Sequence, residues 1–383
     1  MKAYLRVFLI LIASYFVLIL ASSLMPDINI THNINESRKI FDQDGDYPRV
    51  SKNLIQTQLD NFTDILVMVP RTNVDESVFR HSMNMNGYPR YWHGYTVFLR
   101  PMLSVFDMNS VRIVYGITVL TLICLVFNAL YKSISWEAAL GFSIAMAFAH
   151  AEVFGMSMQF SNAFILTFIC MLFIYKKRNA IADNPDKVPL YFFVFGSLVN
   201  FIDLLTAPIV TLTMPLLMVI IYISNRSTAT KSTILTIYCA ISWGVGYALT
   251  WVSKWLIAAA ILQQNVPMDA IHQTFFRVMG DNEWPTDRVA TLLANFEYMF
   301  LNAWVAPVIL LILAASILMK NVVSRAISIP LALISLAPYA WYLLLANHSQ
   351  LHSFFTFRAQ TGTMLIAVFF ALSIIFRDRK TNQ

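Results

Sequence analysis

Carboxylates gather in one polar stretch near the start of the chain. Residues 42–46 place three aspartates within five positions, and Glu36 precedes them. A carboxylate can accept the proton of an attacking hydroxyl, and several carboxylate oxygens together can bind a hard divalent cation. An acidic turn at Gly45 and a helix cap at Glu36 explain the same residues without a function. We treat Asp44, Asp46 and Glu36 as candidate catalytic residues, assign no metal ligand, and leave a divalent cation open.

An aromatic and basic segment follows in the same polar region. Residues 88–95 read YPRYWHGY, and Arg100 comes shortly after them. Aromatic rings with a polar edge are typical of clefts that bind flat apolar faces, including those of sugar rings, and arginine can neutralise a phosphate. The alternative is an interfacial belt of aromatic side chains at the lipid headgroups. We treat Arg90, Trp92 and His93 as candidate substrate-binding residues.

Two histidines and an arginine near the end of the chain form the strongest constellation. Residues 347–358 read NHSQLHSFFTFR, in which His348 and His352 are one helical turn apart if the segment is helical. Their imidazoles and the guanidinium of Arg358 could hold a phosphate. The same histidine spacing occurs in zinc sites, but the glutamate of an HExxH motif is missing, which disfavours zinc.

Three further ionisable residues, Glu152, Asp203 and Lys254, lie in or beside apolar runs. A charge at membrane depth is costly, so a function is the default hypothesis for each. Asp203 could also cap the helix that follows it, and Lys254 could extend its ammonium to the membrane surface or meet an anionic ligand. We expect all three near the substrate. Four later charged residues fit a solvated surface as well as they fit a site, and we assign them no individual role. They are Arg277, Asp281, Glu283 and Arg288.

The composition indicates what kind of fold must position these residues. Of 383 residues, 58% are hydrophobic and 13% charged, whereas a soluble domain has about 45–50% apolar and about 25% charged residues. The mean hydropathy of +0.61 excludes a disordered chain. The three cysteines lie in apolar runs, which argues against a disulfide framework or a metal site. We therefore predict an all-α polytopic membrane protein, a transmembrane helical bundle.

A membrane-spanning helix needs about 20 mostly apolar residues, and the sequence contains about ten such runs. We predict spans at about 5–24, 112–131, 137–153, 160–175, 188–204, 207–224, 232–256, 300–319, 326–346 and 360–376. The first run could be read as a signal peptide, but it is longer than the usual hydrophobic region of one, so we predict a retained helix.

Lysine and arginine residues in the short loops set the predicted orientation. With that number of spans they fall on one side of the membrane together with both termini, and this side is predicted to be the cytoplasm. They are Lys2, Arg6, Lys132, Lys176, Lys177, Arg178, Lys187, Arg226, Lys231, Lys320, Arg325, Arg377, Arg379 and Lys380. The net charge of +6 then reflects topology, so we expect a multi-pass protein of the cell membrane and no nucleic-acid partner.

The opposite face is predicted to carry two long extracytoplasmic loops, 25–111 and 257–299, within a single transmembrane domain of residues 1–383. The candidate residues above map to this face. The sequence contains no P-loop, no GxGxxG motif and no nucleophile elbow, so nucleotide-driven transport and serine-hydrolase chemistry have no support.

This layout resembles that of the GT-C superfamily of integral-membrane glycosyltransferases. One helix precedes a long acidic outer loop, and six more spans lead to a second long outer loop. The segments YPRYWHGY, FIDLLTAP, WVSKW and NHSQLHSFFTFR also look like those of uncharacterised bacterial membrane proteins near this group. The resemblance implies a catalytic Asp or Glu in the first outer loop, here between Glu36 and Asp46, and a polyprenyl-phosphate sugar as donor.

The activity that the resemblance implies is transfer of a hexosyl or pentosyl group at the extracytoplasmic face, with inversion, to a glycan, lipid or protein acceptor of the cell envelope. A carboxylate of the first loop would take the acceptor's proton. Cations would stabilise the lipid phosphate as it leaves. The candidates for that role are Lys254, His348, His352 and Arg358.

Other functions stay open at this point. A polysaccharide polymerase or ligase would act on lipid-linked oligosaccharides at the same face. A transporter or flippase would need charged or broken segments at mid-membrane depth, for which Asp203 and Pro215 are the candidates. A membrane scaffold would need no convergent polar groups. One outer cavity lined by all five of the following residues would support the enzyme, and their scattering over separate surfaces would favour the scaffold: Glu152, Asp203, Lys254, His348 and Arg358.

Overall fold

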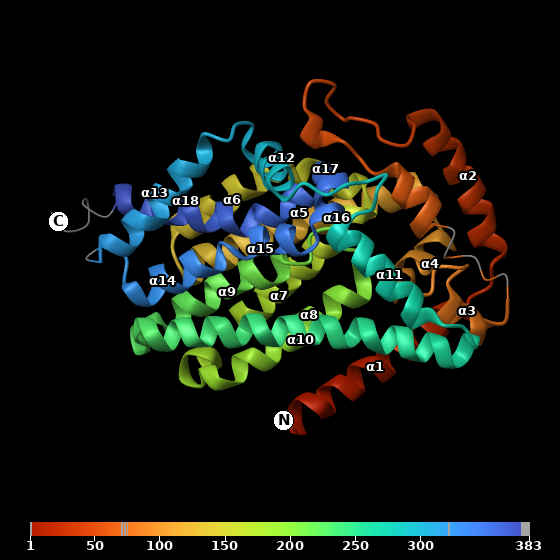
Figure 1. Cartoon of the computed structure of the whole chain (residues 1–383), viewed down its shortest axis with the longest axis horizontal. Coiled ribbons are helices and arrows are strands. Elements are labelled where there is room, and N and C mark those ends of the chain that lie inside the picture. The colour runs from red at the N-terminus through yellow and green to blue at the C-terminus, as the bar shows by residue number, and fades with distance from the viewer. Residues whose placement is uncertain (1, 70–71, 73, 75, 321, 377–383) are drawn as a thin grey trace.

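The chain folds into a bundle of helices. The computed structural model describes residues 2–69, 72, 74, 76–320 and 322–376, and within these ranges no β-strand is formed (Figure 1). This confirms the all-α prediction. Three of the cations used for the predicted orientation, Arg377, Arg379 and Lys380, lie outside the described residues.

The helices follow one another with short connections over most of the chain. The first third forms α1 (Lys2–Ser23), α2 (Ile28–Asp44), α3 (Val78–Asn84), α4 (Thr96–Leu103) and α5 (Met108–Ser133). The middle forms α6 (Trp136–Phe148), α7 (Met158–Asp183), α8 (Val188–Ile202), α9 (Val210–Ile223) and α10 (Ala229–Leu262). The last third forms α11 (Val266–Met279), α12 (Arg288–Phe300), α13 (Val305–Leu318), α14 (Arg325–Ile334), α15 (Ala337–Leu344), α16 (Ala346–Leu351), α17 (Ser353–Thr356) and α18 (Thr361–Phe376). Short 3₁₀ or π turns are η1 (Ile55–Thr57), η2 (Thr63–Met68), η4 (Ala151–Met156), η5 (Pro185–Lys187), η6 (Ser224–Arg226) and η7 (Phe357–Gln360).

Among the described residues, six helical stretches are long and apolar enough to cross a membrane, or seven if α12 and α13, bent by 83°, count as one span. The six are Lys2–Ser23, Met108–Ser133, Met158–Asp183, Ala229–Leu262, Arg325–Leu344 and Ser353–Phe376. Other predicted spans correspond to the shorter helices α6, α8, α9 and α13, which fall below the length of about 20 residues that a bilayer requires. The polytopic helical class is thus borne out, and the larger number of crossings stays a prediction.

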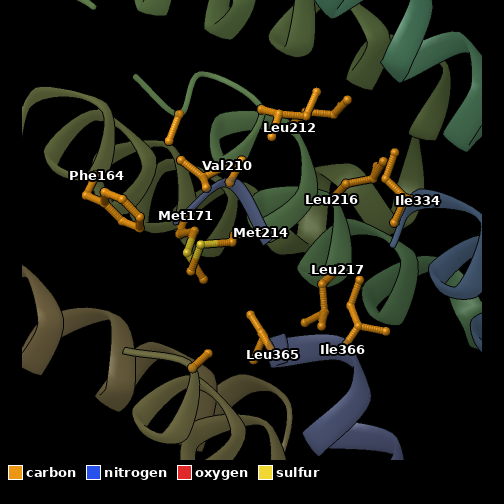
Figure 2. Close-up of a cluster of buried hydrophobic side chains, with 14 of the residues drawn as sticks. Phe164, Met171, Val210, Leu212, Met214, Leu216, Leu217, Ile334, Leu365 and Ile366 are labelled. Carbon is orange, nitrogen blue, oxygen red and sulfur yellow. The ribbon is translucent and has the colours of Figure 1, made fainter. Parts of the chain in front are cut away.

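The core of the bundle surrounds α9. Almost all of its side chains are buried, and they pack against α7, α14 and α18. Figure 2 shows this packing, with Leu216 beside Ile334 and Leu217 beside Ile366. A helix that is apolar on every side is expected at the centre of a membrane bundle, because its neighbours supply packing on all faces.

The closest helix pair is α8 and α10, and two glycines let their backbones touch. A Cβ atom on Gly196 would lie 2.1 Å from the carbonyl oxygen of Trp243, and one on Gly246 would lie 2.1 Å from that of Phe193. Small residues at such crossings allow close packing of helices inside a membrane. This contact fixes where the C-terminal end of α8 meets α10.

The elements of the first long loop gather at one end of the bundle, on the right of Figure 1, together with α11. Arg100, for which we considered a phosphate contact, is fully buried here. Its Nη1 donates to Asp27 at 2.9 Å and its Nε to the carbonyl of Ser22 at 2.8 Å. Arg100 thus ties α4 to the end of α1.

The glycine contact gives a stability prediction. Gly246→Ala should lower the melting temperature of the detergent-solubilised protein by several degrees, because the added methyl group overlaps the α8 backbone. Gly244→Ala is the matched control on the same helix, since a Cβ there meets no atom within 4 Å. Equal melting temperatures for the two variants, measured by thermal unfolding, would contradict the packing.

Candidate functional site

Polar side chains converge where the ends of α8, α10 and α11 meet α16 and the aromatic segment of the first loop. We call this group the Asp203 cluster. Its members are Asp203, Arg277, His348, His352, Tyr88, Tyr91 and Trp251. Its aromatic members are continuous with the apolar core, which includes Tyr91 and against which Tyr88 and Trp251 pack.

The two carboxylate oxygens of Asp203 differ in their hydrogen bonding. It directly follows α8, and its Oδ2 accepts a hydrogen bond from the N–H of Thr206 at 2.9 Å. Its Oδ1 is buried and has no hydrogen-bond partner among the described residues. Asp203 therefore caps the turn that follows it, as the sequence suggested, but only its Oδ2 takes part in the cap. Backbone N–H groups of Leu204 and Leu205 also stabilise this carboxylate. A buried carboxylate oxygen that lacks a donor of its own costs free energy.

The two histidines lie side by side, as their spacing predicts. Their ring centroids are 4.8 Å apart, and Nε2 of His348 is 3.0 Å from the carbonyl oxygen of Leu205, so Nε2 carries the proton. Burial, and then the positive charge of Arg277, lower the pKa of His352 to about 4. Burial, His352 and Arg277 lower the pKa of His348 as well. Both rings are therefore neutral at pH 7.

Arg277 of α11 is the guanidinium that faces these histidines. Its Cζ lies 5.9 Å from the centroid of the Tyr91 ring, and its Nε is buried without a hydrogen-bond partner among the described residues. Its Nη1 donates to the carbonyl of Gln273 at 3.1 Å, so Nε is the atom of Arg277 that is open to a ligand. Sequence reasoning left the role of Arg277 undecided and gave that place to Arg358.

Aromatic rings form one wall of the cluster. The Tyr88 and Tyr91 rings are 5.5 Å apart, and Tyr91 lies 5.6 Å from Trp251 of α10. Arg90 stacks 4.6 Å over Tyr88 and forms an ion pair with Asp269 at 2.7 Å. Such a wall can hold the flat face of a sugar ring. Arg90 shapes this wall and is already paired.

Lys254, Trp92 and His93 lie behind the wall. Lys254 is fully buried, donates to the carbonyl of Met83 at 2.9 Å, and lies 5.6 Å from the Trp92 ring centroid. Trp92 donates to the carbonyl of Thr250 at 2.8 Å. His93 is 2.8 Å from the hydroxyl of Tyr95. These contacts join the first loop to α10.

Arg358 and Glu152 form a separate group. Arg358 is fully buried, and all its nitrogens donate to carbonyl oxygens, including Nε to Ala149 at 3.0 Å and Nη2 to Gln56 at 2.8 Å. Glu152 is half exposed and pairs with His150 at 2.7 Å. The five residues for which we expected one common cavity are therefore divided among three groups of contacts, with Asp203 and His348 in one of them.

The acidic candidates of the first loop lie near its surface. Glu36 forms an exposed pair with Lys39 at 2.7 Å, which lowers the pKa of Glu36. Asp44 is 3.5 Å from Arg112, and Asp46 is exposed. Among the described residues no group of three or more His, Cys, Asp or Glu side chains is arranged to hold a metal ion.

Sequence reasoning missed a buried carboxylate in the same loop. Asp64 is fully buried and accepts hydrogen bonds from the backbone N–H groups of Met158 and Gln159, each at 3.2 Å, at the start of α7. Burial raises the pKa of Asp64 to about 7, while Arg112 and these donors oppose the rise and Asp60 adds to it. Asp64 thus docks the first loop onto the bundle.

An apolar cavity of about 520 Å³ lies beside the site, walled by α1, α4, α5, α7 and α8. Its lining includes Phe201 and Ile202, which directly precede Asp203, and only a few polar side chains such as Tyr115 and Asn162. A cavity of this volume can take part of a hydrocarbon chain.

Comparison of the chain with protein-family models, with curated proteins and with solved structures found no match. The geometry of the Asp203 cluster is therefore the basis for a functional proposal.

The histidines allow a direct test of the cluster. Arg277→Gln should raise the pKa of both His348 and His352, because it removes a positive charge that opposes protonation. The measurement is NMR titration of labelled histidine side chains. Arg288→Gln, on the exposed start of α12, is the control and should leave both values unchanged. Unchanged values in both variants would remove Arg277 from the cluster.

Asp64 gives a prediction on pH and stability. Its pKa is higher in the folded chain, so its contribution is fully present below about pH 4 and is lost as the pH rises to about 7. Asp64→Asn removes this loss. The melting temperature of the wild type should therefore fall more between pH 5.5 and pH 8 than that of Asp64→Asn. Asp42→Asn, an exposed control, should behave as the wild type.

Proposed function

We propose that the chain is an integral-membrane glycosyltransferase that moves a sugar from a polyprenyl-phosphate donor to a glycan, lipid or protein acceptor at the extracytoplasmic face. The observation that carries the proposal is the Asp203 cluster. In it, one carboxylate oxygen and one arginine nitrogen are buried without a hydrogen-bond partner in the part of the chain that the structure describes, beside two neutral histidines. Leaving such buried groups unpaired costs free energy, and a ligand that pairs with them would recover it.

The donor phosphate would bind between Arg277 and the two histidines. Arginine offers two parallel donors to a phosphate, and a bound negative charge would raise the histidine pKa values and make both rings donors. A lipid phosphate leaves with its own negative charge, so the reaction needs cations near the phosphate more than it needs a general acid. Arg277 takes the role for which the sequence had suggested Arg358 and Lys254.

The sugar and the lipid tail have separate surfaces. The Tyr88, Tyr91 and Trp251 rings can stack on a sugar face. The apolar cavity beside Phe201 and Ile202 is suited to the first part of the polyprenyl chain. A donor that is polar at one end and apolar at the other would thus find both environments next to each other.

The chemical step would be a single displacement. The free oxygen of Asp203 takes the proton of the acceptor hydroxyl while the acceptor oxygen bonds to the anomeric carbon. The bond from that carbon to the phosphate oxygen breaks, and the lipid phosphate leaves with the electron pair. Attack from the opposite side inverts the anomeric centre. Asp203 suits this role better than Glu36 or Asp44, which are exposed and paired with Lys39 and Arg112.

The test is transfer of a radiolabelled sugar from polyprenyl-phosphate donors by the protein in liposomes. Asp203→Asn should lower the transfer rate by about 10²–10⁴-fold with little effect on donor binding, because it removes only proton acceptance. Glu36→Gln and Asp46→Asn are the matched controls and should stay near wild type. Loss of transfer in a control with full activity in Asp203→Asn would move the base to the first loop, and a strict need for an oligosaccharide donor would favour a polymerase or ligase.

A further inference from the structure

A second cavity lies at the other end of the bundle, far from the Asp203 cluster in sequence and fold. It has a volume of about 540 Å³ and is formed by the end of α7, the turn η5, the turn η6 and the start of α10. Four charged side chains and an apolar wall line it, and the charged ones are Asp183, Asp186, Arg226 and Lys231. None of these residues takes part in the proposed glycosyl transfer.

The charges of this cleft balance. Two cations, Arg226 and Lys231, stand against two carboxylates, Asp183 and Asp186. Arg226 forms an ion pair with Asp183, and both are about two-thirds exposed. Lys231 and Asp186 are exposed and form no ion pair among the described residues. The cleft therefore offers one free charge of each sign beside a pair that is open to solvent.

An apolar stripe on α10 begins inside the cleft and leads away from it. Ile234 and Tyr238 line the cleft and are themselves exposed. Their face continues with exposed apolar side chains at helical spacing, Ile241, Val245, Leu249, Val252 and Leu256. From Ile234 to Leu256 the helix rises about 33 Å, which matches the hydrocarbon thickness of a bilayer, about 30 Å.

The stripe places the cleft relative to the membrane. Lys231 lies about one turn before the stripe, hence at the level of the lipid headgroups. The distribution of lysine and arginine predicts that this side is the cytoplasm, so the cleft would face the inner leaflet.

We infer that the cleft binds the headgroup of a zwitterionic aminophospholipid of the inner leaflet, with its acyl chains along the α10 stripe. Lys231 and the outer nitrogens of Arg226 contact the phosphate, and the carboxylates of Asp186 and Asp183 accept hydrogen bonds from the primary ammonium. This inference does not depend on the proposed glycosyl transfer.

The balance of charge selects this ligand over its alternatives. A free phosphate or an anionic headgroup gains little in a cleft without net charge, because Asp183 and Asp186 offset Arg226 and Lys231. A quaternary ammonium headgroup has no N–H to donate to Asp186. A water-soluble headgroup would leave the apolar wall at Ile234 and Tyr238 uncovered. A lipid with a phosphate and a primary ammonium pairs with the cations and with the carboxylates, and its acyl chains cover the apolar wall.

The experiment is native mass spectrometry of the full chain in detergent with added phosphatidylethanolamine, phosphatidylglycerol or phosphatidylcholine. Phosphatidylethanolamine should stay bound at the highest collision energy, and Lys231→Gln should lower its occupancy by about tenfold, because a charge-assisted hydrogen bond is lost. Lys132→Gln, an exposed lysine at the end of α5, is the matched control and should retain wild-type occupancy.

Asp186→Asn is a second variant, which tests the ammonium contact independently of Lys231→Gln. Asp186→Asn should shift the preference toward phosphatidylglycerol, since it removes the partner of the ammonium. Equal retention of the three lipids, the same loss in Lys132→Gln as in Lys231→Gln, or binding of glycerophosphoethanolamine as tight as that of the lipid would each overturn the inference.

Discussion

The contact between α8 and α10 determines where the site forms. Gly196 and Gly246 let the two backbones meet, and no side chain larger than hydrogen fits at either position without displacing a carbonyl. Asp203 comes one residue after α8 ends, and Trp251 lies little more than one turn beyond Gly246. A close crossing therefore brings the free carboxylate oxygen to the same end of the bundle as the aromatic wall. The cavity beside Phe201 depends on the same placement of α8.

Two fully buried cations, Arg358 and Lys254, donate to backbone carbonyls rather than to carboxylates. Arg358 donates to the carbonyls of Ala149, Phe354 and Gln56, and Lys254 donates to that of Met83. Each such contact fastens a loop to a helix without an opposing charge, because a carbonyl dipole can satisfy a donor at depth. Arg277 differs from both, since its Nε has no partner among the described residues. Arg358 and Lys254, whose donors are paired with carbonyls, thus stabilise the fold, and the incompletely paired Arg277 remains available to a ligand.

The sequence was sufficient for the class of fold and for local pairs, and insufficient where distant segments meet. Composition predicted an all-α membrane bundle, and helical spacing predicted that His348 and His352 would be neighbours. It could not identify Arg277 as their partner, because that contact joins α11 to α16 across four intervening helices. Asp64 was missed for the same reason: its role depends on the first N–H groups of α7. The apolar outer face of α11, which repeats at helical spacing, was the available sign that Arg277 points inward.

The length of α10 explains how Arg277 reaches the histidines. This helix has 34 residues and is therefore about 51 Å long, whereas a bilayer core is about 30 Å thick. Its last turns extend past the apolar stripe, and the chain then reverses at Gln263, which adopts a left-handed conformation with φ of 57°. Asn265 caps the returning helix α11, which packs on both α10 and α16 (Figure 1). A span of ordinary length would end at the membrane surface and leave no helix to fold back. The overshoot of α10 is thus what carries a guanidinium to a site whose other members lie on α8 and α16.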